Sequence, residues 1–117
     1  MLEKPRRVEK PWGYELIWAE TEDYVGKILH VNAGEASSLQ YHETKDETMF
    51  LLSGEMLFQA GPSADELVDY PMKAGERIHV ATGTVHRMIA TTDVDILEAS
   101  TPHLDDVVRL QDRYGRS

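Results

Sequence analysis

The sequence predicts an all-β fold, either a small antiparallel barrel or a sandwich. From Tyr14 onward, short apolar runs alternate with turn residues, and several of the turns contain glycine, for example Gly34 and Gly54. Strands at regular spacing with glycine-containing turns are typical of this fold class. A chain of 117 residues can also bury one modest core, so we expect a single domain over residues 1–117.

The domain has three expected parts: an N-terminal arm over residues 1–13, a barrel core over 14–100 and a C-terminal segment over 101–117. The apolar runs of the core predict strands at residues 24–31, 48–52, 55–59, 76–80, 85–90 and 94–99. Ser53-Gly54 separates two of these runs and is typical of a tight turn. Residues 63–67 are compatible with a surface turn or a short helix. Residues 104–110 carry apolar side chains at helical spacing and are compatible with a short C-terminal helix packed on the barrel.

The N-terminal arm is expected to pair with another subunit. Open sheets leave edge strands that must be covered, and exposed arm residues such as Trp12 and Tyr14 would provide a cover. We therefore expect a homodimer.

Composition excludes several classes of function. A net charge of −9 argues against broad nucleic-acid binding through the phosphate backbone. No apolar run approaches the length that spans a bilayer, so no membrane partner is expected. The absence of cysteine excludes disulfides and thiolate metal sites, and it favours a cytoplasmic location.

The positive charges cluster near both ends of the chain, whereas acids dominate the middle. The clustered residues are Lys4, Arg6, Arg7, Lys10, Arg109, Arg113 and Arg116. If both ends fold toward one opening, these cations would bind an anionic substrate group such as phosphate. Solvated termini with no such role are the alternative.

Two glycine-bracketed segments, residues 34–54 and 75–86, gather side chains that suit a divalent metal ion. These side chains are Gln40, His42, Glu47 and His86. Gln40 and His42 are two residues apart, so both can face the interior of a barrel from one strand. Imidazole, carboxylate and amide ligands suit Zn, Mn, Fe, Co or Ni without choosing among them. A lone histidine is more often structural, and the joint spacing is what favours a metal site.

These residues resemble the two motifs of the cupin superfamily. In the first motif, Gln40 replaces the first histidine. The other matching positions are Gly34, His42, Glu47 and Gly54 in the first motif and Gly75, Gly83 and His86 in the second. The resemblance implies a small antiparallel barrel of the jelly-roll type with a metal ion in its interior.

A second resemblance covers nearly the whole chain, and it is to the type II mannose-6-phosphate isomerase domain. Leu39-Gln40-x-His42 is similar to a Leu-Gln-x-His motif of that domain, which implies that glutamine is a ligand. The other similar segments are Lys10-Pro11-Trp12-Gly13, Lys27, Glu98, and residues 105–109 and 112–116. One departure follows His42, where the family has a histidine-rich stretch and this chain has Glu43-Thr44-Lys45.

The resemblance implies a metal-dependent isomerase that interconverts an aldose phosphate and a ketose phosphate, of the mannose 6-phosphate type, through an enediol or enediolate. The expected ligands of one divalent ion, with Zn ahead of Mn, Fe, Co and Ni, are Gln40, His42, Glu47 and His86. Lys27 and Glu98 are the expected catalytic residues, and Arg109 or Arg113 is expected to bind the phosphate.

Other interpretations stay open at this point. Lys27 is compatible with a lysine at a strand end, Glu98 with an acid at the barrel rim, and the two arginines with salt bridges. The set of His42, Glu47 and His86 also matches the metal ligands of non-haem iron proteins, so an iron or nickel cupin oxygenase is one alternative. A non-catalytic module that binds a sugar or an acid is the other.

Overall fold

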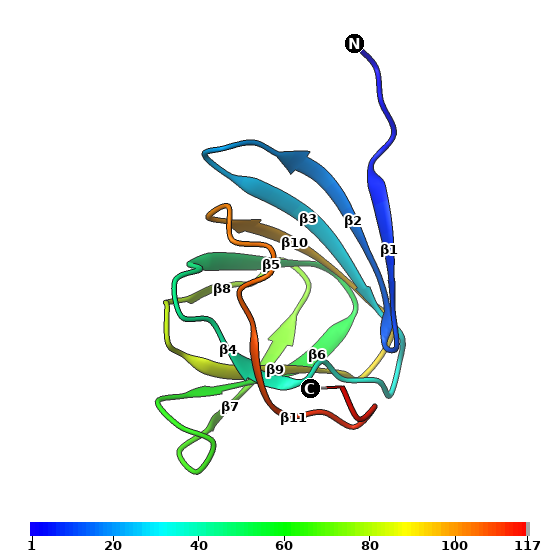
Figure 1. Cartoon of the computed structure of the whole chain (residues 1–117). Helices are drawn as coiled ribbons and strands as arrows, with labels where there is room; N and C mark the ends of the chain where they lie inside the picture. Colours follow the sequence, from blue (N-terminus) through cyan, green and yellow to red (C-terminus); the bar gives the residue numbers. More distant parts are fainter. Residues whose placement is uncertain (117) are drawn as a thin grey trace.

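Residues 1–116 form eleven β-strands that make two facing sheets (Figure 1). The structure is a computed structural model that describes residues 1–116, so the last residue of the predicted segment 101–117 lies outside the described part. The strands are β1 (Arg6–Lys10), β2 (Gly13–Glu20), β3 (Val25–Val31), β4 (Leu39–Tyr41), β5 (Glu47–Ser53), β6 (Glu55–Gly61), β7 (Val68–Lys73), β8 (Arg77–Val80), β9 (Val85–Ala90), β10 (Val94–Ser100) and β11 (Val108–Gln111). Within residues 1–116, no helix has the length and apolar character needed to cross a membrane.

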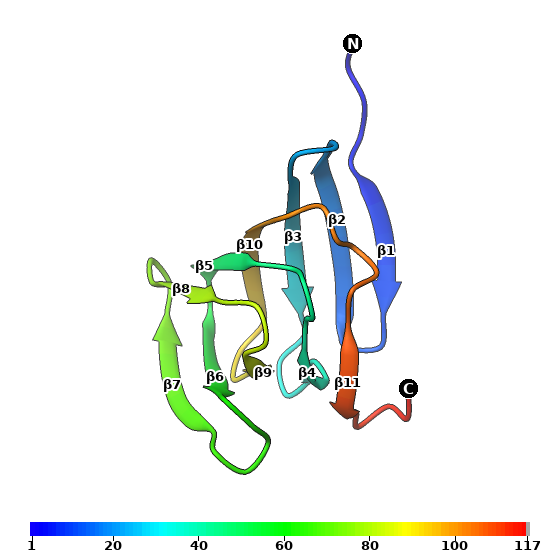
Figure 2. The same cartoon turned by 60° about the vertical axis from the view of Figure 1, so that its left-hand side comes forward.

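The strands are ordered β1-β2-β3-β10-β5-β8 in one sheet and β11-β4-β9-β6-β7 in the other (Figure 2). Neighbouring strands in both sheets are antiparallel, as expected for a small β-barrel of the jelly-roll type. The core lies between the sheets and takes residues from both, including Leu29, Leu51, Phe58, Met88 and Ile96. The predicted all-β barrel is confirmed.

Alternation of side chains explains why the central strands form where the sequence predicts them. In β5, Met49 and Leu51 are buried whereas Phe50 and Leu52 are exposed, so one face of the strand points into the barrel. The six predicted strands are confirmed within two residues at each end, as β3, β5, β6, β8, β9 and β10.

The C-terminal segment corrects one expectation. The short helix that the spacing of residues 104–110 allows does not form, and β11 pairs with β4 instead. A short apolar run does not by itself distinguish a helix from a strand. Here the β-branched Val107 and Val108 favour the extended form, and the edge of β4 supplies backbone partners for it.

The N-terminal arm packs on its own chain. β1 pairs with β2 from Arg6↔Ile17 to Lys10↔Gly13. Trp12 is only 5% exposed and belongs to the core, so the expectation that it is an exposed arm residue is wrong. The turn needs a glycine next to Trp12, because a Cβ atom on Gly13 would lie 1.9 Å from the carbonyl oxygen of His30.

Candidate metal centre

The two sequence motifs meet between the sheets. His42 directly follows β4, and His86 lies on the neighbouring strand β9, where it is the register partner of Gln40. Glu47 begins β5 on the opposite sheet and is buried. The N–H of Gly83, a residue with φ of 84°, donates a 2.9 Å hydrogen bond to the carbonyl oxygen of His42 and ties the second motif to the first.

Three of the four predicted metal ligands converge on one point inside the barrel. His42 Nε2 lies 3.3 Å from Glu47 Oε1, and His86 Nε2 lies 3.2 Å from the same oxygen. One nitrogen or oxygen from each of the three side chains falls within 4.8 Å of the others. The residues are 4%, 2% and 1% exposed, in the order His42, Glu47, His86. This is the spacing of ligands around a single ion.

Backbone carbonyl groups fix the protonation of both imidazoles. His42 Nδ1 hydrogen-bonds to the carbonyl oxygen of Asp106, and His86 Nδ1 lies 2.9 Å from that of Thr84. A carbonyl oxygen only accepts, so both Nδ1 atoms carry protons. Each Nε2 atom then directs its lone pair toward Glu47, as in metal sites where the second ring nitrogen is held by an outer hydrogen bond.

The facing atoms lack hydrogen-bond donors. Among the described residues, His42 Nε2, His86 Nε2 and both carboxylate oxygens of Glu47 are buried without a hydrogen bond, and of these atoms Glu47 Oε2 has the ion pair with Lys45. Buried polar atoms are almost always satisfied, so positive charge is needed between them. A proton on an imidazole or a metal ion can provide it, and two imidazoles around one carboxylate oxygen are a donor set that suits a divalent metal ion.

Glu47 is held in its ionised form. Burial alone would raise the pKa of its carboxyl group. A proton placed on Nε2 of His42 or His86 would be donated to this carboxylate, and this contribution, with the positive charge of Lys45, outweighs burial and holds the pKa well below its usual range. An ionised carboxylate is the form that binds a metal ion.

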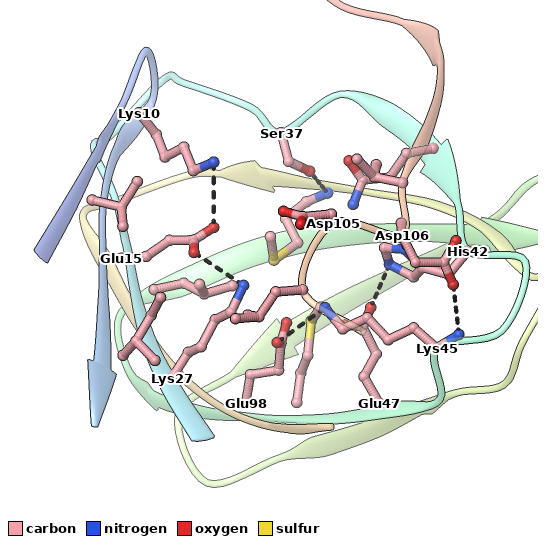
Figure 3. A pocket seen from close by; sticks show the side chains of 18 of the residues that line it. Lys10, Glu15, Lys27, Ser37, His42, Lys45, Glu47, Glu98, Asp105 and Asp106 are labelled. Carbon is pink, nitrogen blue, oxygen red and sulfur yellow. Dashed lines mark hydrogen bonds and ion pairs between the residues drawn. The ribbon is translucent and has the colours of Figure 1, made fainter. Parts of the chain in front are cut away.

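Lys45 is a site residue that the sequence reasoning missed. Its Nζ atom lies 2.9 Å from Glu47 Oε2 and 3.3 Å from Glu98 Oε2 (Figure 3). Burial lowers the pKa of Lys45, but the two carboxylates outweigh burial and raise it to about 12. The available signal was its position two residues before Glu47, which places both side chains on one face of an extended segment.

Lys27 and Glu98, the predicted catalytic residues, face each other from adjacent strands. They are direct partners in the β3–β10 pair, and both side chains are buried. Lys27 Nζ lies 3.0 Å from Glu15 Oε2. Burial and the negative charge of Glu47 raise the pKa of Glu98 to about 7, against the opposing charges of Lys45 and Lys27. Both residues therefore lie inside the barrel. This placement differs from the alternatives of a lysine at a strand end and an acid at the barrel rim.

The remaining predicted residues differ in their placement. Gln40 lines the same cavity, and its Oε1 accepts a 2.6 Å hydrogen bond from Ser38 Oγ, which leaves a second lone pair on that oxygen. Arg109 lines the cavity from β11, where it is the register partner of Gln40. Arg113 is not brought to this cavity: its Nη1 donates a 2.7 Å hydrogen bond to the carbonyl oxygen of Gly34.

The cavity has a volume of about 420 Å³ and is lined by charged residues. Six of the twelve lysines and arginines of the chain line it, together with six aspartates and glutamates. These cations are Arg6, Lys10, Lys27, Lys45, Arg109 and Arg116. Both ends of the chain thus contribute positive side chains to one opening, as the clustering in the sequence suggests.

Comparison with known proteins finds mannose-1-phosphate guanylyltransferases similar to this chain. The chain is 31% identical over 117 residues to mannose-1-phosphate guanylyltransferase ManC of Salmonella typhimurium strain LT2. It is also 31% identical, over 120 residues, to mannose-1-phosphate guanylyltransferase of Escherichia coli strain K12. Each match covers 95% of this chain but only 23% of the relative, so the chain spans about a quarter of the length of these proteins.

Solved structures share the fold at low sequence identity. Capsular polysaccharide assembling protein CapF of Staphylococcus aureus superposes with a TM-score of 0.81 at 16% identity, over 95% of this chain and 33% of that one. The S161A mutant of Bacillus subtilis oxalate decarboxylase gives 0.76 at 18% identity, over 90% and 30%. KdgF from Halomonas sp. gives 0.71 at 16% identity, over 83% and 87%.

The family is shown by a direct match of the sequence. The cupin domain model matches residues 27–100, which include β3 through β10 apart from the first two residues of β3, and all three converging ligands. The barrel of two antiparallel sheets and the buried His42, Glu47 and His86 agree with this match. The chain belongs to the cupin domain family.

Proposed function

We propose that this cupin domain binds one divalent metal ion and interconverts an aldose phosphate and a ketose phosphate of the mannose 6-phosphate type. The observation that carries the proposal is the shared cavity: a buried carboxyl group, Glu98, whose pKa is raised to about 7, lines the same cavity as two of the three converging ligands, His42 and Glu47. His42, Glu47 and His86 would hold the ion, with Gln40 as the fourth donor.

The donor set fits Zn, Mn, Fe, Co or Ni, and Zn stays the first expectation. A solved structure of Bacillus subtilis oxalate decarboxylase, which shares the fold at 18% identity, comes from work on the Mn(II) centres of that protein. When bound, a divalent ion would supply Lewis-acid polarisation of the carbonyl and hydroxyl oxygens of the sugar.

Glu98 is the proposed base. Isomerisation moves a proton from the carbon beside the carbonyl group to the neighbouring carbon, so one group can remove the proton and return it. A carboxyl group whose pKa is about 7 is available in both forms near neutral pH, which suits this task. The reaction also moves the proton of the adjacent hydroxyl group to the former carbonyl oxygen. Lys27, the partner of Glu98 across the strand pair, is the proposed hydrogen-bond donor that stabilises the negative charge developing on this oxygen.

Six basic and six acidic side chains line the cavity, and the place of one basic residue, Arg109, supports a phosphorylated substrate. Arg109 lies on β11 beside Gln40, which places a guanidinium group and a proposed metal ligand on neighbouring strands of one cavity. Guanidinium groups bind phosphate through paired hydrogen bonds. We assign the phosphate to Arg109 in preference to Arg113, which contacts Gly34 outside the cavity. The mannose 6-phosphate type is supported by the sequence resemblance and by relatives named for mannose 1-phosphate.

Metal-loaded protein assayed with mannose 6-phosphate and fructose 6-phosphate tests the proposal. We expect about one ion per chain and turnover in both directions, both lost in Glu47→Gln and both kept in Glu55→Gln, an exposed glutamate on β6. Metal binding without turnover of either sugar phosphate would contradict the isomerase and favour a non-catalytic binding module. Oxygen consumption by the loaded protein would favour the oxygenase.

We also propose a homodimer as the assembly. Trp18, Phe50 and Leu52 are exposed on strands β2 and β5 of the six-stranded sheet, and exposed apolar side chains on one sheet favour protein contact. Sedimentation at several protein concentrations tests this. The cytoplasmic location stays a prediction from composition.

A further inference from the structure

The side chain of Lys45 lies between two carboxylates of the cavity and is buried, with 5% of the residue exposed. Its Nζ atom is 2.9 Å from Glu47 Oε2 and 3.3 Å from Glu98 Oε2. Burying an ammonium group is costly unless it is paired, and these two contacts provide the pairing. Lys45 therefore has a fixed place beside the candidate metal centre, although it is not a ligand.

The two oxygens of Glu47 have different neighbours. Oε1 faces His42 Nε2 at 3.3 Å and His86 Nε2 at 3.2 Å, whereas Oε2 faces the ammonium group of Lys45. A carboxylate can bind a metal ion through one oxygen or through both. The contact with Lys45 holds Glu47 Oε2 and leaves Oε1 as the oxygen that faces the two histidines.

We propose that Lys45 is a positioning residue that reserves Glu47 Oε2, so that Glu47 binds the metal ion through Oε1 alone. This inference rests on the metal binding in the proposed function. If the ion is six-coordinate, such as Mn(II), one oxygen from Glu47 with the donors His42, His86 and Gln40 would bring the protein ligands to four and would leave about two positions free. The isomerisation presents two oxygens of the sugar, on adjacent carbons, and both need a free position. A second Glu47 oxygen on the ion would remove one of them.

The chain anchors Lys45 at its backbone as well as at its ammonium group. Its N–H donates a 2.8 Å hydrogen bond to Asp106 Oδ2, and its carbonyl oxygen accepts a 3.1 Å hydrogen bond from Thr82 Oγ1. The carbonyl group of Asp106 also accepts the Nδ1 proton of His42. Asp106 thus orients the imidazole of His42 and the backbone of Lys45, and Lys45 in turn restrains Glu47.

A simpler role for Lys45 is to neutralise two buried carboxylates. That role predicts a loss of stability when the charge is removed, with the coordination of the metal ion unchanged. The positioning role predicts a change in coordination itself. A measurement that counts the water molecules on the bound ion separates the two roles and does not depend on catalysis.

The experiment compares Mn(II)-loaded wild type, Lys45→Met and Lys73→Met by water-proton relaxation, with circular dichroism to verify folding. Lys73 is an exposed lysine at the end of β7 and is the matched control for the lost charge. We expect the inner-sphere relaxivity of Lys45→Met to fall by about half, because about one of two free positions is taken by Glu47 Oε2. The control should equal wild type. A folded, Mn-bound Lys45→Met protein with wild-type relaxivity would overturn the inference and leave the metal site standing.

If Lys45→Met does not fold, the crystal structure of Mn(II)-loaded wild type decides the question. Glu47 Oε1 on the ion with Oε2 at Lys45 supports the inference, and both oxygens on the ion overturn it. A folded wild type that binds no divalent metal would overturn the metal site of the proposed function, and the inference with it.

Discussion

Lys27 and Glu98 are direct partners across the β3–β10 pair, and both side chains are buried inside the barrel. They belong to a row of alternating charges that crosses the cavity (Figure 3). Lys10 Nζ lies 3.8 Å from Glu15 Oε1, Glu15 Oε2 lies 3.0 Å from Lys27 Nζ, and Lys45 connects Glu98 to Glu47. Each carboxylate in the row has a cation beside it, so the protonation of Glu98 depends on its neighbours.

Glu98 should set the pH dependence of the isomerisation. Burial and the negative charge of Glu47 raise the pKa of Glu98 to about 7, and a base acts in its deprotonated form. We therefore expect kcat/KM to rise with pH through about 7 and then to level off. Glu98→Gln should lower kcat by roughly 100-fold or more and remove this rise. A pH profile of Glu98→Gln that keeps wild-type shape and rate would show that another group is the base.

Lys27 should shift that profile without abolishing it. The positive charge of Lys27 lowers the pKa of Glu98, so Lys27→Met should move the midpoint of the pH profile upward while the rate falls. Steady-state rates from pH 5 to 9 measure the midpoint. Lys4→Met, an exposed lysine before β1, is the charge control and should leave the midpoint in place. A midpoint that moves downward in Lys27→Met would contradict the electrostatic account.

Metal binding should stabilise the fold. The ligands come from both sheets, so an ion held by Glu47 on β5 and His86 on β9 binds the folded state and not the unfolded chain. At 100 times its Kd, such an ion would raise the free energy of unfolding by about 2.7 kcal/mol. Thermal melts with and without a chelator measure this, and His86→Ala should melt at the same temperature in both conditions. Equal melting of wild type with saturating metal and with chelator would argue against the site.

Asp106 should stabilise the fold at neutral pH and cease to do so in acid. Its carboxylate accepts hydrogen bonds from the backbone N–H groups of Lys45, Glu43 and Thr44, which lower its pKa from 3.8 to about 2. Because the folded-state pKa is the lower one, this stability is present above about pH 4 and is lost as pH falls through about 2. Asp106→Ala should therefore unfold at lower urea than wild type at pH 7, and the difference should shrink between pH 4 and 2. Asp105→Ala, a neighbouring exposed acid, is the control, and a pH-independent difference for Asp106→Ala would contradict the account.

The sequence predicts the central strands well because their burial follows side-chain alternation. Edge strands give a weaker signal: in β7, Val68, Tyr70 and Met72 alternate along the chain but only Met72 is buried, and Pro71 interrupts the run, which is tolerated only at a sheet edge. The C-terminal helix is wrong for a related reason, since Val107 and Val108 satisfy a helical spacing over too few residues to exclude a strand.

In the candidate site, residues that match the sequence motifs were predicted, and a residue placed by strand pairing was not. The spacing of the two glycine-bracketed motifs predicts that His42, Glu47 and His86 come together, because the glycines mark the turns that set the local backbone geometry around each ligand. Lys45 was not predicted because a lysine in a polar stretch is usually solvated, and only the pairing of β10 with β5 in one sheet places Glu98 beside it. Charge pairing inside a barrel depends on strand neighbours that are distant in sequence.

The most direct test of the central claim is an anomalous-scattering map from crystals of the metal-loaded protein soaked with a hexose phosphate. We predict one peak bounded by His42 Nε2, Glu47 Oε1 and His86 Nε2, inside the cavity lined by Lys27 and Glu98. A folded protein that shows no peak there at saturating metal would contradict it.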